Sequence, residues 1–150
     1  MIGFYDDAHA ALPEEVRGFP VLGDVGMLKS MLSVEQVHVV VAITDNVARL
    51  RIANSIRGLG GMFFTAVHPA AYASMAAVIG DGTVLAAGAV VHPEAAVGSH
   101  CYVGPRAVVG PGARVGARAA LGQNASVGRK AVVEEDGRVP ALATVEGGER

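Results

Sequence analysis

The stretch that decides the fold is Ile79–Val91, IGDGTVLAAGAVV, in which an aliphatic residue returns at every sixth position. Counting by sixes in both directions extends this aliphatic column from Val67 to Val145, and all 14 of its positions are apolar. At the chain-average apolar content of 51%, such a column would arise by chance about once in ten thousand trials. The repeat therefore reflects a structural unit that recurs along more than half of the chain.

Two further columns share the period of six. Small residues, mostly alanine, lie four positions after the aliphatic residue from Ala71 to Ala143, and Cys101 takes one of these places. Glycine directly follows the aliphatic residue at seven places, which are Gly80, Gly98, Gly104, Gly110, Gly116, Gly122 and Gly128. We expect these glycines to supply turn conformations that a Cβ atom would penalise.

A period of six matches neither the 3.6-residue face of a helix nor a heptad repeat. It is typical of a β-solenoid, in which each repeat supplies a short strand and a turn, and stacked repeats bury a continuous core. The sequence therefore predicts a solenoid over residues 67–145. The charged run at residues 134–138 predicts a polar end to the stack, and we expect residues 146–150 to form a flexible tail.

Composition narrows the class of protein. A formal net charge of −2 and a pI near 6.2 provide no basic surface for nucleic acid. No apolar run reaches the roughly 18 residues of a membrane span. The single cysteine, Cys101, cannot form an intrachain disulfide, and we interpret it as a buried substitute for alanine rather than a reactive thiol. A reducing, cytoplasmic location follows as the default.

Residues 1–66 have a different pattern. Apolar runs predict strands at 2–5, 37–43 and 62–67, and helical spacing predicts helices at 25–32, capped by Asp24, and at 47–57. Residues 13–23, which contain two prolines and two glycines, are interpreted as a connection. The result is a small parallel α/β unit. We expect it to be incomplete, because no glycine-rich G-x-G-x-x-G phosphate loop occurs in it.

Together these features resemble the left-handed β-helix, hexapeptide-repeat sugar acyltransferases. The closest group is the bacterial nucleotide-aminosugar N-acetyltransferases and sialic-acid O-acetyltransferases. The matching stretches are IGFYDD (2–7), FPVLG (19–23), VVAITDN (40–46), VHPA (67–70), IGDGTVLAAGAVV (79–91) and the hexads to Gly128. The resemblance implies a left-handed parallel β-helix with three hexads per coil. It also implies a homotrimer, with acetyl-CoA as co-substrate between adjacent prisms and no metal ion.

By that resemblance, five residues would line a nucleotide-sugar pocket at the carboxyl ends of the parallel strands. They are Asp6, Asp7, Thr44, Asp45 and Asn46. Open α/β sheets generally bind ligands at this edge. The alternative is that these residues only cap helices and form turns, as acidic and Asn residues after strands often do.

The position of the general base departs from the family pattern. Aligned on the family, Pro111-Gly112 stands where His-Asp or His-Glu belongs, and Ala120 stands near the place of a second histidine. Neither proline nor alanine accepts a proton. With three hexads per coil, His92 lies on the same side of the prism, one coil away or roughly 4.8 Å. His92 is therefore the candidate base, with a turn histidine on the surface as the alternative.

Three hypotheses remain open. The first is an acetyl-CoA-dependent acyltransferase that acts on a nucleotide-linked aminosugar or a sialic-acid-like sugar. The second is a catalytically silent, trimeric β-helical scaffold or ligand-binding relative. The third is a coding region truncated before Met1, so that a strand and its phosphate loop are lost.

Overall fold

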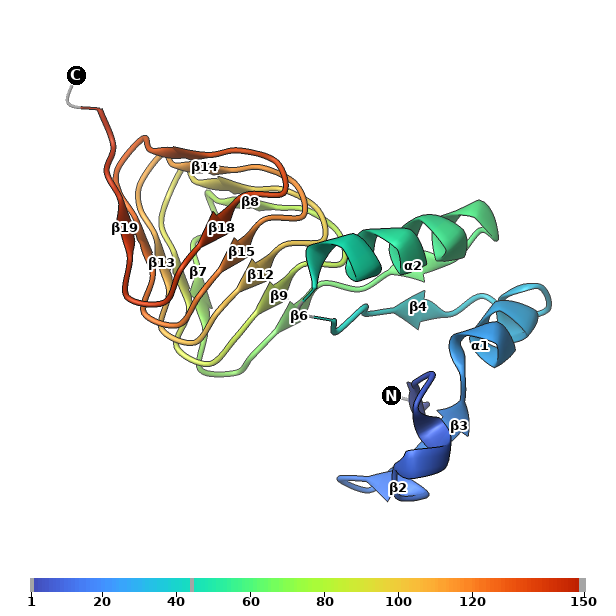
Figure 1. Ribbon diagram of the computed structural model, residues 1–150. Coiled ribbons are helices and arrows are strands. Elements are labelled where there is room, and N and C mark those ends of the chain that lie inside the picture. The colour runs from blue at the N-terminus through green and yellow to red at the C-terminus, as the bar shows by residue number, and fades with distance from the viewer. Residues whose placement is uncertain (1, 44, 149–150) are drawn as a thin grey trace. The chain divides into compact units, whose positions relative to one another are not determined.

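The computed structural model describes residues 2–43 and 45–148. Contacts among them define two compact units (Figure 1). The first comprises the residues up to His38 together with Ile52–Met62, and the second comprises Val39–Arg51 and the residues from Phe63 onward. No helix formed by the described residues is long and apolar enough to cross a membrane.

The second unit contains the predicted solenoid, a left-handed parallel β-helix with three flat faces (Figure 1). The first face holds β7 (Tyr72–Ala73), β10 (Val90–Val91), β13 (Val108–Val109), β16 (Ser126–Val127) and β19 (Thr144–Val145). The second face holds β8 (Val78–Ile79), β11 (Ala96–Val97), β14 (Arg114–Val115) and β17 (Val132–Val133). The third holds β6 (Ala66–Val67), β9 (Val84–Leu85), β12 (Tyr102–Val103), β15 (Ala120–Leu121) and β18 (Arg138–Val139).

Strands on one face pair in parallel with a constant step. Val91 pairs with Val109 and Val109 pairs with Val127, so each coil contains three hexads. The prediction of three hexads per coil is confirmed. Consecutive strands in the sequence thus lie on different faces, and each face is a ladder of strands from successive coils.

The aliphatic and small columns form the core, as predicted. Side chains of the aliphatic column in the middle coils, such as Val103 and Val109, are fully buried. Burial of each contributes on the order of 1.5–3 kcal/mol to folding. Thr83 takes the place of a small residue and is also buried, with its hydroxyl donating to the Gly98 carbonyl at 2.7 Å and accepting from the Cys101 amide at 3.1 Å. The polar atom of Thr83 is therefore satisfied inside the core.

The glycine column has a different role from the predicted one. The left-handed conformation belongs to the residue two positions after each glycine, such as His100 (φ 57°) and Arg106 (φ 55°). From His100 onward, the amides of these left-handed residues donate to the previous coil, as His100 N does to Asp81 O at 2.9 Å. The column glycines are instead required by space, because a Cβ on Gly98 would lie 2.6 Å from the backbone nitrogen of Ala117.

In the first unit, β1 (Phe4–Tyr5) pairs in parallel with β3 (Phe19–Gly23), which pairs antiparallel with β2 (Glu15–Val16). A short 3-10 helix (His9–Ala11) lies between β1 and β2 in the chain. The prediction that residues 13–23 are only a connection is wrong, since they contain the central strand of this sheet. Helix α1 (Val25–Leu32) and its cap Asp24 are as predicted.

The remaining elements differ in length from the prediction. The apolar run at 37–43 forms only the short strand β4 (His38–Val39), which joins β5 (Met62–Phe63) in a two-stranded sheet. The predicted strand at 62–67 is divided into β5 and β6. Helix α2 (Asn46–Gly58) agrees with the predicted helix to within one residue at each end.

Candidate functional site

Asp6 and Asp7, two of the predicted sugar-binding residues, follow β1 in the first unit. The Asp6 side chain accepts a hydrogen bond from the Ala8 amide at 2.8 Å, and the Asp7 side chain accepts one from the Val25 amide at 3.1 Å. Val25 is the first residue of α1, so Asp7 stabilises the positive end of that helix. Both carboxylates are exposed.

Asp45 and Asn46 stand at the start of α2, in the second unit. Asp45 is exposed, and its Oδ1 accepts from the Ala48 amide at 2.8 Å, the arrangement of an N-cap. Asn46 is only 6% exposed. Its Nδ2 donates to the carbonyl oxygen of Asp136 at 3.3 Å, and its Oδ1 accepts from Arg49 at 3.0 Å. Thr44, the fifth predicted residue, lies outside the described residues.

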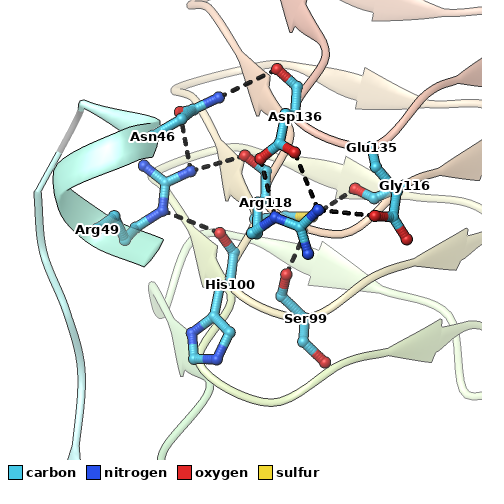
Figure 2. Close-up of polar contacts among 9 residues, drawn as sticks. Asn46, Arg49, Ser99, His100, Gly116, Arg118, Glu135 and Asp136 are labelled. Carbon is cyan, nitrogen blue, oxygen red and sulfur yellow. Dashed lines mark hydrogen bonds and ion pairs between the residues drawn. The ribbon is translucent and has the colours of Figure 1, made fainter. Parts of the chain in front are cut away.

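Arg49, one turn along α2, connects the helix to the β-helix (Figure 2). Its side chain is buried and donates from Nε to the carbonyl of His100 at 3.0 Å and from a terminal nitrogen to the carbonyl of Arg118 at 2.9 Å. A third bond, of 2.8 Å, goes to the carbonyl of Ile43. Burial lowers the pKa of Arg49 from its ordinary value. The sequence reasoning did not single out this residue.

The carbonyl groups that receive these bonds form a column along one corner of the prism. His100, Arg118 and Asp136 follow one another at intervals of one coil and hold the same left-handed position, with φ between 57° and 64°. We call these three residues the anchor corner. Asn46 and Arg49 therefore bind main-chain atoms of three consecutive coils.

Side chains reinforce the anchor corner from outside (Figure 2). Arg118 donates from Nε to Asp136 at 2.8 Å and from a terminal nitrogen to Glu135 at 2.7 Å. These hydrogen bonds lower the pKa of Asp136 and raise the pKa of Arg118. Because both carboxylates are largely exposed, solvent screens the pairs and their contribution to stability is modest.

His92, the predicted general base, follows β10 in a different corner of the prism. It is half-buried, and its ring makes no hydrogen bond or ion pair with any residue that the structure describes. Its amide donates to the carbonyl of Val109 in the next coil at 2.9 Å. The second face of the prism, β8, β11, β14 and β17, separates the corner of His92 from the anchor corner. Within one chain, His92 and Asn46 are therefore not brought together.

Pro111 and Gly112 occupy the turn one coil above His92. Pro111 is exposed, and Gly112 has the left-handed φ of 65° and donates to the carbonyl of Pro93 at 3.1 Å. Lys130 follows in the next coil, and its amide donates to the carbonyl of Pro111 at 3.0 Å.

Two other polar side chains of the β-helix, those of His100 and Cys101, are buried and contact neighbouring residues. The His100 ring is buried and meets the Phe63 ring edge to face, with centroids 4.5 Å apart. The Cys101 thiol is buried and donates to the carbonyl of Gly116 at 3.1 Å, and its burial raises its pKa. No group of three or more His, Cys, Asp or Glu side chains in residues 2–43 and 45–148 is placed to hold a metal ion.

Comparisons with known proteins match both parts of the chain. Residues 1–56 match the family model of the PglD N-terminal domain, and residues 76–111 match that of the bacterial transferase hexapeptide repeat. No curated protein sequence matches the chain closely enough to count as a relative.

Solved structures extend the likeness over nearly the whole chain. A mutant of perosamine N-acetyltransferase from Caulobacter crescentus, in complex with CoA and GDP-perosamine, is 27% identical over 91% of this chain and 73% of that chain, with a TM-score of 0.74. The acetyltransferase domain of PglB from Neisseria gonorrhoeae FA1090, in complex with acetyl coenzyme A, is 28% identical over 97% of this chain and 83% of that chain, with a TM-score of 0.64. The predicted resemblance to the left-handed β-helix, hexapeptide-repeat sugar acyltransferases is therefore confirmed for both parts of the chain.

Proposed function

We propose that the protein is an acetyl-CoA-dependent N-acyltransferase that acts on a nucleotide-linked aminosugar. The observation that carries the proposal is the likeness to an N-acetyltransferase bound to CoA and GDP-perosamine, which covers the α/β part as well as the β-helix. The hexads alone would support only the fold, whereas the N-terminal match supports a sugar-nucleotide substrate. A sialic-acid-like acceptor remains the second possibility for the substrate, and we retain the cytoplasmic location predicted from the single cysteine.

The reaction requires one proton transfer that a side chain can assist. The sugar amine attacks the thioester carbonyl carbon, a carbon–nitrogen bond forms, and the amine loses a proton to a base. The carbon–sulfur bond then breaks, CoA leaves as the thiol after accepting a proton, and the product is the amide. His92 is the residue that we assign as base, because its ring is half-buried, makes no described hydrogen bond and lies one coil from the family position.

We further propose that the site forms between adjacent chains of a homotrimer. We assign Asp45 to the sugar nucleotide. It lies beside the anchor corner, and His92 lies at another corner of the same prism. One substrate can meet both groups if one chain provides the base and its neighbour provides the sugar-binding side chains. This arrangement would account for the separation of Asp45 and His92 at different corners of one prism.

A thiol-release assay with acetyl-CoA and a panel that contains GDP-perosamine and UDP-linked aminosugars tests the activity. We expect thiol release that depends on both substrates, and we expect calorimetry to show CoA binding. Absence of turnover combined with absence of CoA binding would reject the proposal. CoA or sugar-nucleotide binding without turnover would instead identify the silent, ligand-binding relative, which the Pro111-Gly112 turn favours.

Mixed trimers test the position of the site. Asp45→Asn keeps the oxygen that caps α2 but removes the charge, and His92→Ala removes the base. We expect each variant alone to be weakly active, and a refolded equal mixture to regain about one quarter of the wild-type activity, the statistical share of interfaces with both native residues. A mixture no more active than its components would place both residues in one chain's site or exclude one of them.

A further inference from the structure

Arg49 is a buried cation whose hydrogen bonds join the start of α2 to two coils of the β-helix. It is 3% exposed, and its guanidinium donates to the carbonyls of His100, Arg118 and Ile43 and to the side chain of Asn46, over 2.8 to 3.0 Å. Burial of a charge is costly unless hydrogen bonds compensate for the lost water. A surface helix needs no such residue to form, so the placement of Arg49 calls for a reason beyond the stability of α2.

We propose that Arg49 is a positioning residue of the sugar-nucleotide site, which fixes the first turn of α2, and with it the carboxylate of Asp45, to the anchor corner of the β-helix. The identity of the ligand in this inference rests on the proposed function. Arg49 itself acts through the backbone and through Asp45, and it does not contact the substrate.

The polar atoms at the start of α2 divide into two sets. Both polar atoms of the Asn46 side chain are engaged within the protein, one by Arg49 and one by the carbonyl of Asp136. Asp45 is exposed and uses Oδ1 for the Ala48 amide. Asn46 and Arg49 therefore form the internal support, and Asp45 is the side chain presented to a ligand.

The anchor corner, to which Asn46 and Arg49 are bonded, is held in place by hydrogen bonds between coils. The amide of Arg118 donates to the carbonyl of Ser99 at 2.8 Å, and the amide of Asp136 donates to the carbonyl of Ala117 at 3.0 Å, so the coil-to-coil ladder fixes the residues whose carbonyls Arg49 and Asn46 bind. A side chain held by main-chain carbonyls of adjacent coils cannot shift without breaking several bonds at once. Precise placement matters, because an error of about 1 Å in a site can cost a hundredfold in rate.

Only arginine has the donors that this geometry uses. The bonds leave from Nε and from both terminal nitrogens, so they point in three directions within one plane. Lysine carries its three donors on a single atom and cannot reach acceptors on the helix and on two coils together. We therefore expect Arg49→Lys to be an incomplete replacement.

The test combines hydrogen exchange with ligand binding on the full chain. In Arg49→Met we expect faster exchange in the segment 45–51 while the coils remain protected. We also expect the Kd for GDP-perosamine, or for whichever nucleotide aminosugar the wild type binds, to rise about 10- to 100-fold. The Kd for acetyl-CoA should stay within about twofold, a split that general destabilisation would not produce. Arg49→Lys should fall between wild type and Arg49→Met on both measures.

Arg51→Met is the matched control. Arg51 is an exposed arginine of the same helix, and no described contact involves its side chain, so this variant should match the wild type in exchange and in both affinities. Unchanged exchange in Arg49→Met, or an unchanged affinity for a sugar nucleotide that the wild type does bind, would overturn the positioning role. If the wild type binds no nucleotide aminosugar, the proposed function and the positioning role both fail, while slower or faster exchange still reports whether Arg49 anchors the helix.

Discussion

Gly104 lies so close to Leu121 in the next coil that a Cβ atom on it would come within 2.6 Å of the Leu121 carbonyl oxygen. That oxygen also accepts the Gly104 amide at 2.9 Å, so the contact is part of the ladder that joins the coils. The backbone of Leu121 cannot retreat without lengthening this hydrogen bond. A Cβ atom on residue 104 would therefore force the backbone to shift against this hydrogen-bond ladder.

Gly104→Ala should destabilise the β-helix by about 1–3 kcal/mol, the usual cost of forcing extra atoms into a packed region. Gly112→Asn is the matched control: Gly112 has a φ of 65°, which asparagine tolerates, and the nearest atom to its Cβ position is a side-chain carbon of Lys130 at 3.4 Å. Urea unfolding at fixed protein concentration measures both. A Gly104→Ala protein as stable as the wild type would show that space does not require glycine at this position.

Val109→Asp should prevent the β-helix from folding. Val109 is 0% exposed, and an aspartate there would bury a charge that has no partner. Val132→Asp is the control, because it makes the same substitution at an outward-facing valine that is 53% exposed. It should alter the free energy of unfolding by no more than about 0.5 kcal/mol. Circular dichroism and light scattering distinguish the two outcomes, and a folded Val109→Asp protein would contradict the assignment of the core.

Asp136 makes stability depend on pH in the acid range. Because Arg118 lowers its pKa in the folded state, Asp136 contributes stability above the pKa of the unfolded chain, about 4, and loses it as the pH falls through the lower folded value. Asp136→Asn should lower Tm by about 1–3 °C at pH 6 and leave it unchanged near pH 2. Glu146→Gln, which removes an exposed charge with no described partner, should show no such pH dependence.

Cys101 should react slowly with thiol reagents in the native protein. Its thiol is buried, and the burial raises its pKa and so reduces the thiolate that alkylating reagents attack. Mass spectrometry after a short exposure to iodoacetamide should find little label, and labelling should be complete in guanidinium chloride. Rapid native labelling would place Cys101 at an accessible position and would add a background to the thiol-release assay.

His92→Ala should lower kcat for acetyl transfer by about 10²- to 10⁴-fold and leave KM for acetyl-CoA nearly unchanged, since the ring acts on the proton of the amine. His68→Asn provides the control, because His68 accepts a hydrogen bond from the Ala70 amide at 3.0 Å at the start of the β-helix. That variant should retain the wild-type rate. A wild-type kcat in His92→Ala would remove His92 from the reaction.

The sequence predicts the β-helix well because the residues of its core recur at every sixth position without interruption. Val109 and its equivalents are buried as the column predicted, and Asp24 caps α1 through the Met27 amide at 2.8 Å. The strand β3 was missed because Gly18 and Pro20 are typical of loops, although Pro20 occupies only the second position of the strand. The sequence shows where a glycine stands. It does not show whether the glycine is needed for a left-handed backbone conformation or because a Cβ atom would clash with a neighbouring coil.

Part of the candidate site could not be predicted for a similar reason. Arg49 binds the main-chain carbonyls of His100 and Arg118, which are 51 and 69 positions further along the chain. Every residue has a carbonyl group, so the side chains in the sequence do not show which carbonyls will accept these bonds. The one available signal was the spacing of Asn46 and Arg49, three residues apart on a helix, which allows their side chains to meet. His92, by contrast, could be placed on a corner by counting coils.

The step of one coil, or three hexads, from Val91 to Val109 has a consequence for how such a protein can change in length. An insertion of a single residue within a coil would turn every later aliphatic side chain away from the core and break the pairing above it. An insertion of three whole hexads beyond Asp136 would add one rung to each face and leave the bonds from Asn46 and Arg49 where they are. The height of the prism can therefore change only in steps of one whole coil. Homologous chains can differ by whole coils while the anchored end of α2 stays the same.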